Sequence, residues 1–316
     1  DAYQDLVVIR LGENLLLKGL GNCNFEKVNR AYSFDGGREW TTGFSAIFEK
    51  GNSFPTLAFG NYVDRSAPGT PWGTCHANQL IRPFGEQKDI PNYSQPIKLE
   101  PGFCSLSMLF TDWNNSGEPA LRITNDRQYY RGGEEQLWQI SPDTLPKLYT
   151  QRQGWKKLNI WGMGISEADI NGDGRPDYVL SSMGDTMLQT LDEEADEDLP
   201  VYRDIAFDRK MTAHRPYVGG DAKPSTGWHT QFADFNNDGF DDFFGPSTGY
   251  DNYPFIGESN LLLLSDGENG YKDVSIGDPN FDYLGFTHGS GIGDINNDGN
   301  IDIVTVDNCT PQNQIG

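Results

Sequence analysis

The nine residues "DINNDGNID" at 294–302 decide how the rest of the chain is interpreted. They place oxygen-bearing side chains at positions 1, 3, 5 and 9 and a glycine at position 6. The same pattern occurs as "DINGDGRPD" at 169–177 and as "DFNNDGFDD" at 234–242. Oxygen ligands spaced this closely are typical of calcium loops. Three copies in one chain predict about three calcium sites.

These loops do not belong to EF-hands. An EF-hand loop needs a bidentate glutamate at position 12 and a helix on either side. Position 12 is Leu180, Gly245 or Thr305 here. Each loop runs instead into a short apolar stretch, "YVLSS", "FFGPS" or "IVTV", which predicts a strand. The aspartate at position 9 therefore replaces the missing glutamate.

The loops are part of a longer repeat. A weaker copy, "DWNNSGEPA", lies at 112–120, and "FEKGNSFPT" at 48–56 keeps only the frame. The five starts, at 48, 112, 169, 234 and 294, are 64, 57, 65 and 60 residues apart. A regular spacing of this length indicates a repeat architecture.

A second landmark follows each loop. "NLLLKGLGNCNFEKV" at 14–28 and "NLLLLSDGENGYKDV" at 260–274 predict strands joined by a tight turn. Looser copies lie at 78–90 and 135–149, and "NQI" at 313–315 resembles the start of another. Each repeat of roughly 60 residues is then expected to contain about four strands, which is typical of the blades of a β-propeller.

The combination of loop, small-residue strand and "N-x-L" hairpin resembles FG-GAP (VCBS-type) repeats, the blades of integrin α-subunit propellers. "FGNYVD" followed by "CHANQLIRP", and "GWHTQFADFNNDGFDDFF" leading to "NLLLLSDGENGYKDV", resemble the cartilage acidic protein (ASPIC/UnbV-associated) branch. The resemblance implies an all-β, seven-bladed propeller with calcium in its loops and an extracellular setting. We expect residues 1–316 to form one such domain, with five to six blades present and both ends falling within a repeat.

The expected calcium ligands follow from the loop positions. Positions 1, 3, 5 and 9 supply side-chain oxygens and position 7 a backbone carbonyl. The sets are Asp169, Asn171, Asp173, Arg175 and Asp177; Asp234, Asn236, Asp238, Phe240 and Asp242; and Asp294, Asn296, Asp298, Asn300 and Asp302. The alternative for each is a metal-free Asx-rich turn. In 112–120 one remaining carboxylate is too few for a divalent ion, and 48–56 has lost nearly every ligand. We expect the ions to be structural.

Charge and hydropathy exclude several classes of partner. The chain has 46 acidic and 24 basic residues, a formal net charge of −22. Nucleic-acid binding needs clustered lysine and arginine, so it is not expected. No apolar run approaches the roughly 20 residues of a membrane span. The acidic run "DEEADED" at 192–198 is interpreted as a solvated insertion, the alternatives being another cation site or a charged partner surface.

The four cysteines suit an exported protein with two disulfides. Cys23, Cys75, Cys104 and Cys309 show no C-x-x-C spacing. Cys75 with Cys104 is the shorter pairing, but spacing alone does not determine connectivity, and four buried thiols remain the alternative.

No catalytic residue is predicted. The histidines are His76, His214, His229 and His288. His229 and His288 precede their loops on a strand, where packing is expected, and no G-x-S-x-G, H-E-x-x-H or phosphate-binding loop is present. We expect a secreted calcium-binding propeller that binds a protein or glycan, as an adhesion module does. The alternatives are an extracellular enzyme on a propeller scaffold, such as a polysaccharide lyase or hydrolase, and a structural subunit of an extracellular assembly.

Overall fold

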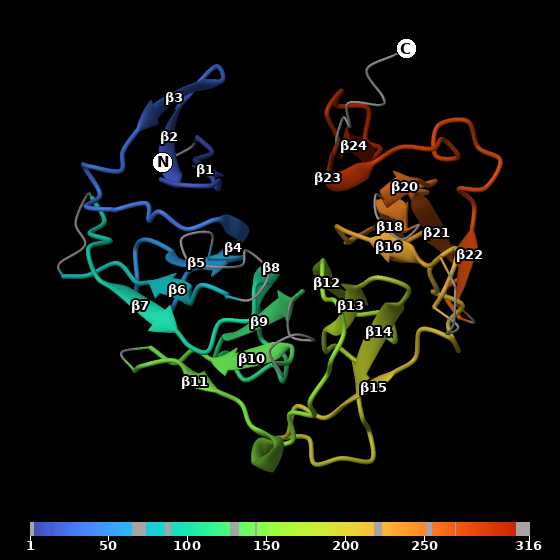
Figure 1. Ribbon diagram of the computed structural model, residues 1–316, viewed down its shortest axis with the longest axis horizontal. Helices are drawn as coiled ribbons and strands as arrows, with labels where there is room; N and C mark the ends of the chain where they lie inside the picture. Colours follow the sequence, from blue (N-terminus) through green and yellow to red (C-terminus); the bar gives the residue numbers. More distant parts are fainter. Residues whose placement is uncertain are drawn as a thin grey trace. The chain divides into compact units, whose positions relative to one another are not determined.

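The computed structural model describes residues 3–64, 74–85, 90–126, 133–142, 144–217, 223–250, 255–268 and 270–307. These residues form short antiparallel strands and one 3₁₀ turn, η1 (Gln151–Gln153), so the chain is all-β as expected (Figure 1). Within them, no helix has the length and apolar character needed to cross a membrane. The chain divides into two compact units, which are described separately below. Unit 1 comprises Asp1–Asp112, Ser116–Tyr149 and Lys157–Ile160; unit 2 comprises Trp113–Asn115, Thr150–Lys156 and Trp161–Gly316.

Unit 1 contains three sheets whose strands pair in the order of the sequence. The three-stranded sheet is β1 (Leu6–Val8), β2 (Leu15–Gly21) and β3 (Asn24–Lys27). The first four-stranded sheet is β4 (Thr41–Ile47), β5 (Thr56–Asn61), β6 (Asn78–Ile81) and β7 (Pro96–Leu99). The second is β8 (Ser105–Thr111), β9 (Ala120–Asn125), β10 (Gln136–Gln139) and β11 (Lys147–Leu148).

Unit 2 repeats this arrangement. One four-stranded sheet is β12 (Ile165–Ala168), β13 (Asp177–Ser181), β14 (Thr186–Leu191) and β15 (Tyr202–Asp204). Another is β17 (Gln231–Ala233), β18 (Asp242–Gly245), β21 (Leu261–Ser265) and β22 (Tyr271–Asp273). A pair is formed by β23 (Thr287–Gly293) and β24 (Asp302–Asp307).

Unit 2 also contains a small sheet that the repeat pattern did not predict. It consists of β16 (Ser225–Gly227), β19 (Ser247–Tyr250) and β20 (Phe255–Gly257). The stretch "FFGPS" was expected to be one strand, but it is divided between β18 and β19 at Pro246. Proline has no N–H for a ladder bond, so the chain leaves one sheet there and enters another.

The five repeat loops occupy equivalent places. Each joins the first strand of a sheet to the second, and the residue before the loop always pairs with the residue at position 9. These register pairs are Ile47 with Thr56, Thr111 with Ala120, Ala168 with Asp177, Ala233 with Asp242, and Gly293 with Asp302. The repeat frame read from the sequence is therefore confirmed in five separate sheets, including the two whose ligands are lost.

The "N-x-L" landmark has a structural reason. Asn78 Oδ1 accepts the backbone N–H of Asn61 at 2.8 Å, and Asn260 Oδ1 accepts that of Ser247 at 3.2 Å. In both cases the asparagine precedes or begins the third strand and binds the chain where it leaves the second. Asparagine at this point satisfies a backbone group that the strand ladder leaves unpaired.

Apolar cores lie between successive sheets within each unit. In unit 1 one cluster joins the first four-stranded sheet to the second and includes Leu80, Leu121 and Trp138. In unit 2 Val179 and Phe243 belong to a cluster shared by the two four-stranded sheets.

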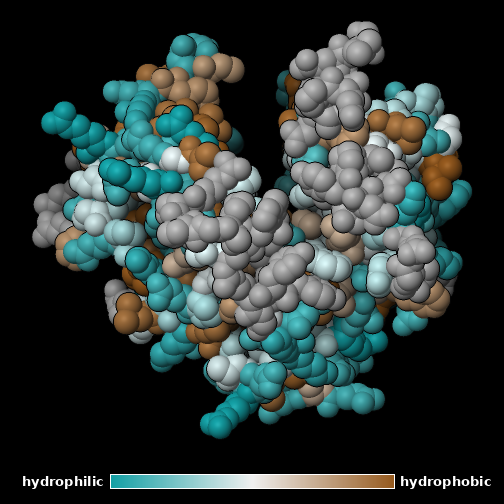
Figure 2. Space-filling view, viewed as in Figure 1, coloured by the Kyte–Doolittle hydropathy of each residue, from teal (hydrophilic) through white to brown (hydrophobic). Residues whose placement is uncertain are grey.

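Figure 2 shows hydrophilic residues over much of the face in view, with smaller apolar areas between them.

Candidate metal-binding loops

The three full loops share one backbone conformation. Position 4 has a positive φ in each, at Gly172 (72°), Asn237 (59°) and Asn297 (59°). The glycine at position 6 does too, with φ between 80° and 93° at Gly174, Gly239 and Gly299. The expected reversal at position 6 is thus confirmed. The second left-handed residue was not anticipated, although asparagine and glycine, which tolerate this region best, stand at position 4 every time.

The carboxylate at position 1 organises each loop. One oxygen of Asp169 accepts the N–H of Asp173 at 3.0 Å and the other accepts that of Gly174 at 2.9 Å. Asp234 makes the same two bonds in its loop, and Asp294 does so in the third. The side chain therefore folds the turn back onto its own start.

Positions 3 and 5 are also bound to each other and to the backbone. Asn171 Oδ1 accepts the N–H of Asp173 at 2.9 Å, while its Nδ2 donates to Asp173 Oδ2 at 3.0 Å. Asp173 Oδ1 accepts the N–H of Arg175, the position 7 residue, at 2.8 Å. Equivalent bonds recur in the loops at 234–242 and 294–302.

The aspartate at position 9 is the deepest group of the set. Its Oδ2 accepts the N–H of position 2 in every loop, at 3.0 Å for Asp177, 3.0 Å for Asp242 and 2.9 Å for Asp302. Asp177 and Asp242 are almost fully buried. Burial raises the pKa of Asp177 to about 6, with backbone and Thr190 hydrogen bonds opposing the rise. Burial likewise raises the pKa of Asp242.

The expected side-chain ligands are thus gathered loop by loop, with nine carboxylates among them. In the described part of the chain, no lysine or arginine forms an ion pair with any of the nine. Arg175, within the first loop, pairs instead with Glu197 at 3.6 Å. A dense carboxylate set without a protein cation is the chemistry that suits a hard divalent ion.

The carboxylates of a loop do not by themselves form a complete metal-binding site. Among the described residues, no three histidine, cysteine, aspartate or glutamate side chains form a group that could hold a metal. An ion would need the asparagine oxygen and a backbone carbonyl as well. In each loop the asparagine Nδ2 now faces the position 5 carboxylate, so the amide would have to turn its oxygen inward.

The loop at 112–120 keeps the turn without the ligands. Asp112 accepts the N–H groups of Ser116 and Gly117 at 2.9 and 2.7 Å, as position 1 does elsewhere. Ala120 stands at position 9. Turn geometry therefore survives with one carboxylate, and the turn alone is not a sign of metal.

Residues of neighbouring repeat loops contact one another within unit 2, which the sequence did not reveal; Trp113–Asn115 are the part of the loop at 112–120 that belongs to this unit. Asn115 Nδ2 donates to the carbonyl of Gly174 at 2.6 Å, and Asn237 Nδ2 donates to Asn300 Oδ1 at 2.8 Å. Each contact runs from position 4 of one loop to position 6 or 7 of another. The loops are therefore connected rather than independent.

The acidic run 192–198 lies in the connection between β14 and β15, and most of its side chains are exposed. With Asp173 and Arg175 it borders a pocket of about 380 Å³. Its place between strands agrees with an insertion.

The histidines that precede the loops are packed. Burial lowers the pKa of both His229 and His288, and His288 lies against the Trp228 ring at 4.2 Å between centroids. His214 Nε2 contacts Asp273 at 3.0 Å and the Ser275 hydroxyl at 3.3 Å. Serine and aspartate meet the same nitrogen, so this group lacks the relay geometry of a catalytic triad.

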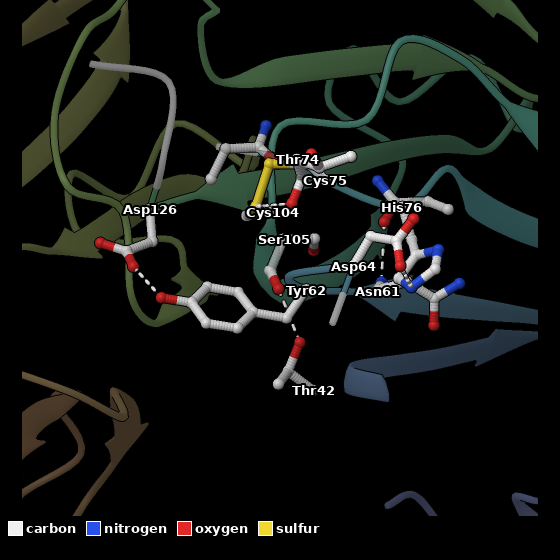
Figure 3. The surroundings of a disulfide bond; sticks show 12 residues. Thr42, Asn61, Tyr62, Asp64, Thr74, Cys75, His76, Cys104, Ser105 and Asp126 are labelled. Carbon is white, nitrogen blue, oxygen red and sulfur yellow. Dashed lines mark hydrogen bonds and ion pairs between the residues drawn. A yellow bond between two sulfur atoms is a disulfide. The ribbon is translucent and has the colours of Figure 1, made fainter. Parts of the chain in front are cut away.

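The disulfide in unit 1 joins Cys75, ahead of β6, to Cys104, ahead of β8 (Figure 3). This confirms the shorter pairing; Cys23 is exposed and free, and Cys309 lies outside the described residues. Beside the disulfide the buried Tyr62 hydroxyl donates to buried Asp126 (Figure 3). Each of these two residues is 8% exposed.

Comparisons with known proteins assign no family. No family model matches the chain, and no curated protein matches it. Among solved structures, one match is a lectin from Agrocybe aegerita described as recognising non-reducing terminal N-acetylglucosamine. The likeness has a TM-score of 0.41 and 14% identity, and it covers 85% of this chain and 61% of the lectin. A match at this level assigns neither a fold nor a ligand.

Proposed function

We propose that the chain is a calcium-stabilised β-propeller of the FG-GAP/VCBS kind that binds a protein or glycan outside the cell. The observation that carries the calcium assignment is the recurrence of one loop geometry in three repeats. Nine carboxylates lie in these loops, and none of them has an ion pair with lysine or arginine among the described residues. About three calcium ions would offset two of the three negative charges in each loop.

The propeller assignment is supported by the sheets. Four of the described sheets have four antiparallel strands in chain order, apart from the β16–β19–β20 insertion, and each of these runs as a meander. Propeller blades have this form. Five to six blades of a seven-bladed ring would then be present in a single domain spanning 1–316.

Secretion is supported by the disulfide, because such bonds persist in oxidising compartments. Extracellular calcium is also abundant enough to fill loops with only three carboxylates each, whose affinity is expected to be modest. Adhesion or ligand binding is proposed in preference to catalysis, since the Ser275, His214 and Asp273 group lacks relay geometry and Tyr62 with Asp126 is buried.

Calcium titration of EDTA-treated protein by isothermal calorimetry tests the metal assignment. We expect binding at about three sites and a higher melting temperature in calcium than in EDTA. Magnesium serves as the control, because it demands a stricter octahedral geometry and should bind more weakly. Heat absent from the titration together with an unchanged melting temperature would refute the assignment.

A glycan array probed with and without calcium tests the binding role. Calcium-dependent capture of a defined glycan class would support a lectin-like module. Turnover of a polysaccharide substrate would instead favour the enzyme alternative.

A further inference from the structure

We infer that Arg82 is the built-in counter-ion of the degenerate loop 48–56, and that calcium dependence is therefore confined to unit 2. The second half of this inference rests on the proposed calcium binding. The first half concerns only residues of unit 1. The outcome is a chain with one metal-independent unit and one metal-dependent unit.

The geometry places a guanidinium at the degenerate loop. Glu49 stands at position 2 of the loop, and its side chain is 1% exposed. Arg82 Nε donates to Glu49 Oε1 at 2.7 Å, and the Thr56 hydroxyl donates to the same oxygen at 2.5 Å. Thr56 is the position 9 residue, paired with Ile47 as the aspartates of the full loops are paired with theirs. Position 2 is Ile170, Phe235 or Ile295 in the full loops and position 9 is an aspartate, whereas here a glutamate at position 2 reaches the threonine at position 9 and binds a fixed protein cation.

Arg82 also links two sheets. It directly follows β6, and its two terminal nitrogens donate to the carbonyls of Thr144 at 2.5 Å and Ser141 at 2.9 Å. Those carbonyls belong to the turn between β10 and β11, in the next sheet. The planar fork of arginine suits this task, because its donors are held in fixed directions, whereas the ammonium group of lysine could satisfy fewer partners at once.

Unit 1 has a second metal-independent link between the same two sheets. The Cys75–Cys104 disulfide joins the segment before β6 to the segment before β8. In the described residues of unit 2, by contrast, the loops are joined by exposed asparagine contacts such as Asn237 to Asn300. Removal of calcium should therefore leave nine repelling carboxylates in unit 2 and leave the Glu49–Arg82 pair unchanged in unit 1.

Hydrogen–deuterium exchange of the whole chain, in calcium and in EDTA, tests the inference. Exchange reports local opening, so each unit can be followed separately. We expect EDTA to increase exchange about tenfold or more in 165–181, 231–245 and 287–307, and less than about twofold in 41–61 and 105–125. An equal increase in both units would overturn the confinement of calcium dependence and leave calcium binding intact. No change in either unit would refute the proposed function, and this inference with it.

Substitutions at the pair test the role of Arg82 directly. Arg82→Met leaves a buried carboxylate without its cation, so exchange in 41–61 should rise about 100-fold, equally in calcium and in EDTA. Arg215→Met is the matched control, since Arg215 Nε makes a similar 2.9 Å contact with buried Glu258 in unit 2. It should raise exchange in unit 2 and leave 41–61 unchanged.

A double variant covers the case in which Arg82→Met does not fold. Glu49→Gln with Arg82→Met removes both charges and should recover most of the protection of 41–61, because replacement of a whole buried pair is far less costly than removal of one partner. Normal protection of 41–61 in Arg82→Met would overturn the inference. So would a double variant no better protected or folded than the single one.

Discussion

Asp242→Asn separates a calcium ligand from an ordinary Asx turn. Both carboxylate oxygens of Asp242 are used: Oδ2 accepts the N–H of Phe235 at 3.0 Å and Oδ1 that of Ser265 at 2.8 Å. Asparagine keeps one acceptor and turns an NH₂ group toward the other N–H. One buried donor is then unpaired, at a cost of about 1–3 kcal/mol in the free energy of unfolding, with or without metal.

Calcium adds a second loss that appears only when the ion is present. An intact site gains about 2.7 kcal/mol when calcium is at 100 times its dissociation constant. Asp242→Asn should therefore cost about 1–3 kcal/mol in EDTA and about 4–6 kcal/mol in saturating calcium. Asp238 and Asp234 are like charges near Asp242. Loss of the Asp242 charge relieves repulsion when no ion is bound, so the cost in EDTA should lie toward the lower end of this range.

Urea unfolding curves of wild type and variant in both conditions measure these costs, with the slope checked for constancy. Asp241→Asn is the control: it changes charge by the same amount one residue away, but Asp241 is at position 8 and is not an expected ligand. Its effect should differ between the two conditions by less than about 1 kcal/mol. Equal costs of Asp242→Asn in calcium and EDTA would refute a ligand role.

Three further predictions concern the backbone, the disulfide and pH. Gly239→Ala should lower the unfolding free energy by about 1–2 kcal/mol, because φ is 93° with no atom near the added Cβ; Gly291→Ala, equally uncrowded but without a positive φ, should show no such loss in the same melts. Replacement of Cys75 and Cys104 by alanine should cost about 2–4 kcal/mol, measured as a lower urea midpoint that reducing agent no longer alters. Burial lowers the pKa of His288 below its ordinary value of 6.5. As the pH is lowered through 6.5, the unfolded chain therefore binds a proton that the folded chain does not, and the free energy of unfolding decreases as the pH decreases. His288→Phe should flatten this part of the wild-type stability curve between pH 7.5 and 5.5.

The repeat could be read from the sequence because its signals are local. Position 1 binds positions 5 and 6, and position 9 binds position 2, all within nine residues. The order of aspartate, asparagine and glycine is enough to specify a turn of this kind, because the bonds that close it are local. The strands on either side followed from apolar runs, and their pairing followed from the shortness of the loop.

The features that the sequence did not reveal join distant residues. Arg82 reaches Glu49 across 33 residues and Thr144 across 62. Only the tertiary structure could show that a guanidinium is bound to the carboxylate of the degenerate loop at 48–56. The same holds for the 63 residues between Asn237 and Asn300. Long-range partners leave no periodic trace in a single sequence.

What "DINNDGNID" determines by itself is therefore the turn, the strand that follows and the supply of carboxylates. The tertiary structure decided in which loop a protein cation balances the charge of a carboxylate and in which loops, among the described residues, none does. The physical reason is that a turn is closed by bonds along the chain, whereas the charge of a buried carboxylate is balanced by whatever group the packing of neighbouring sheets brings to it.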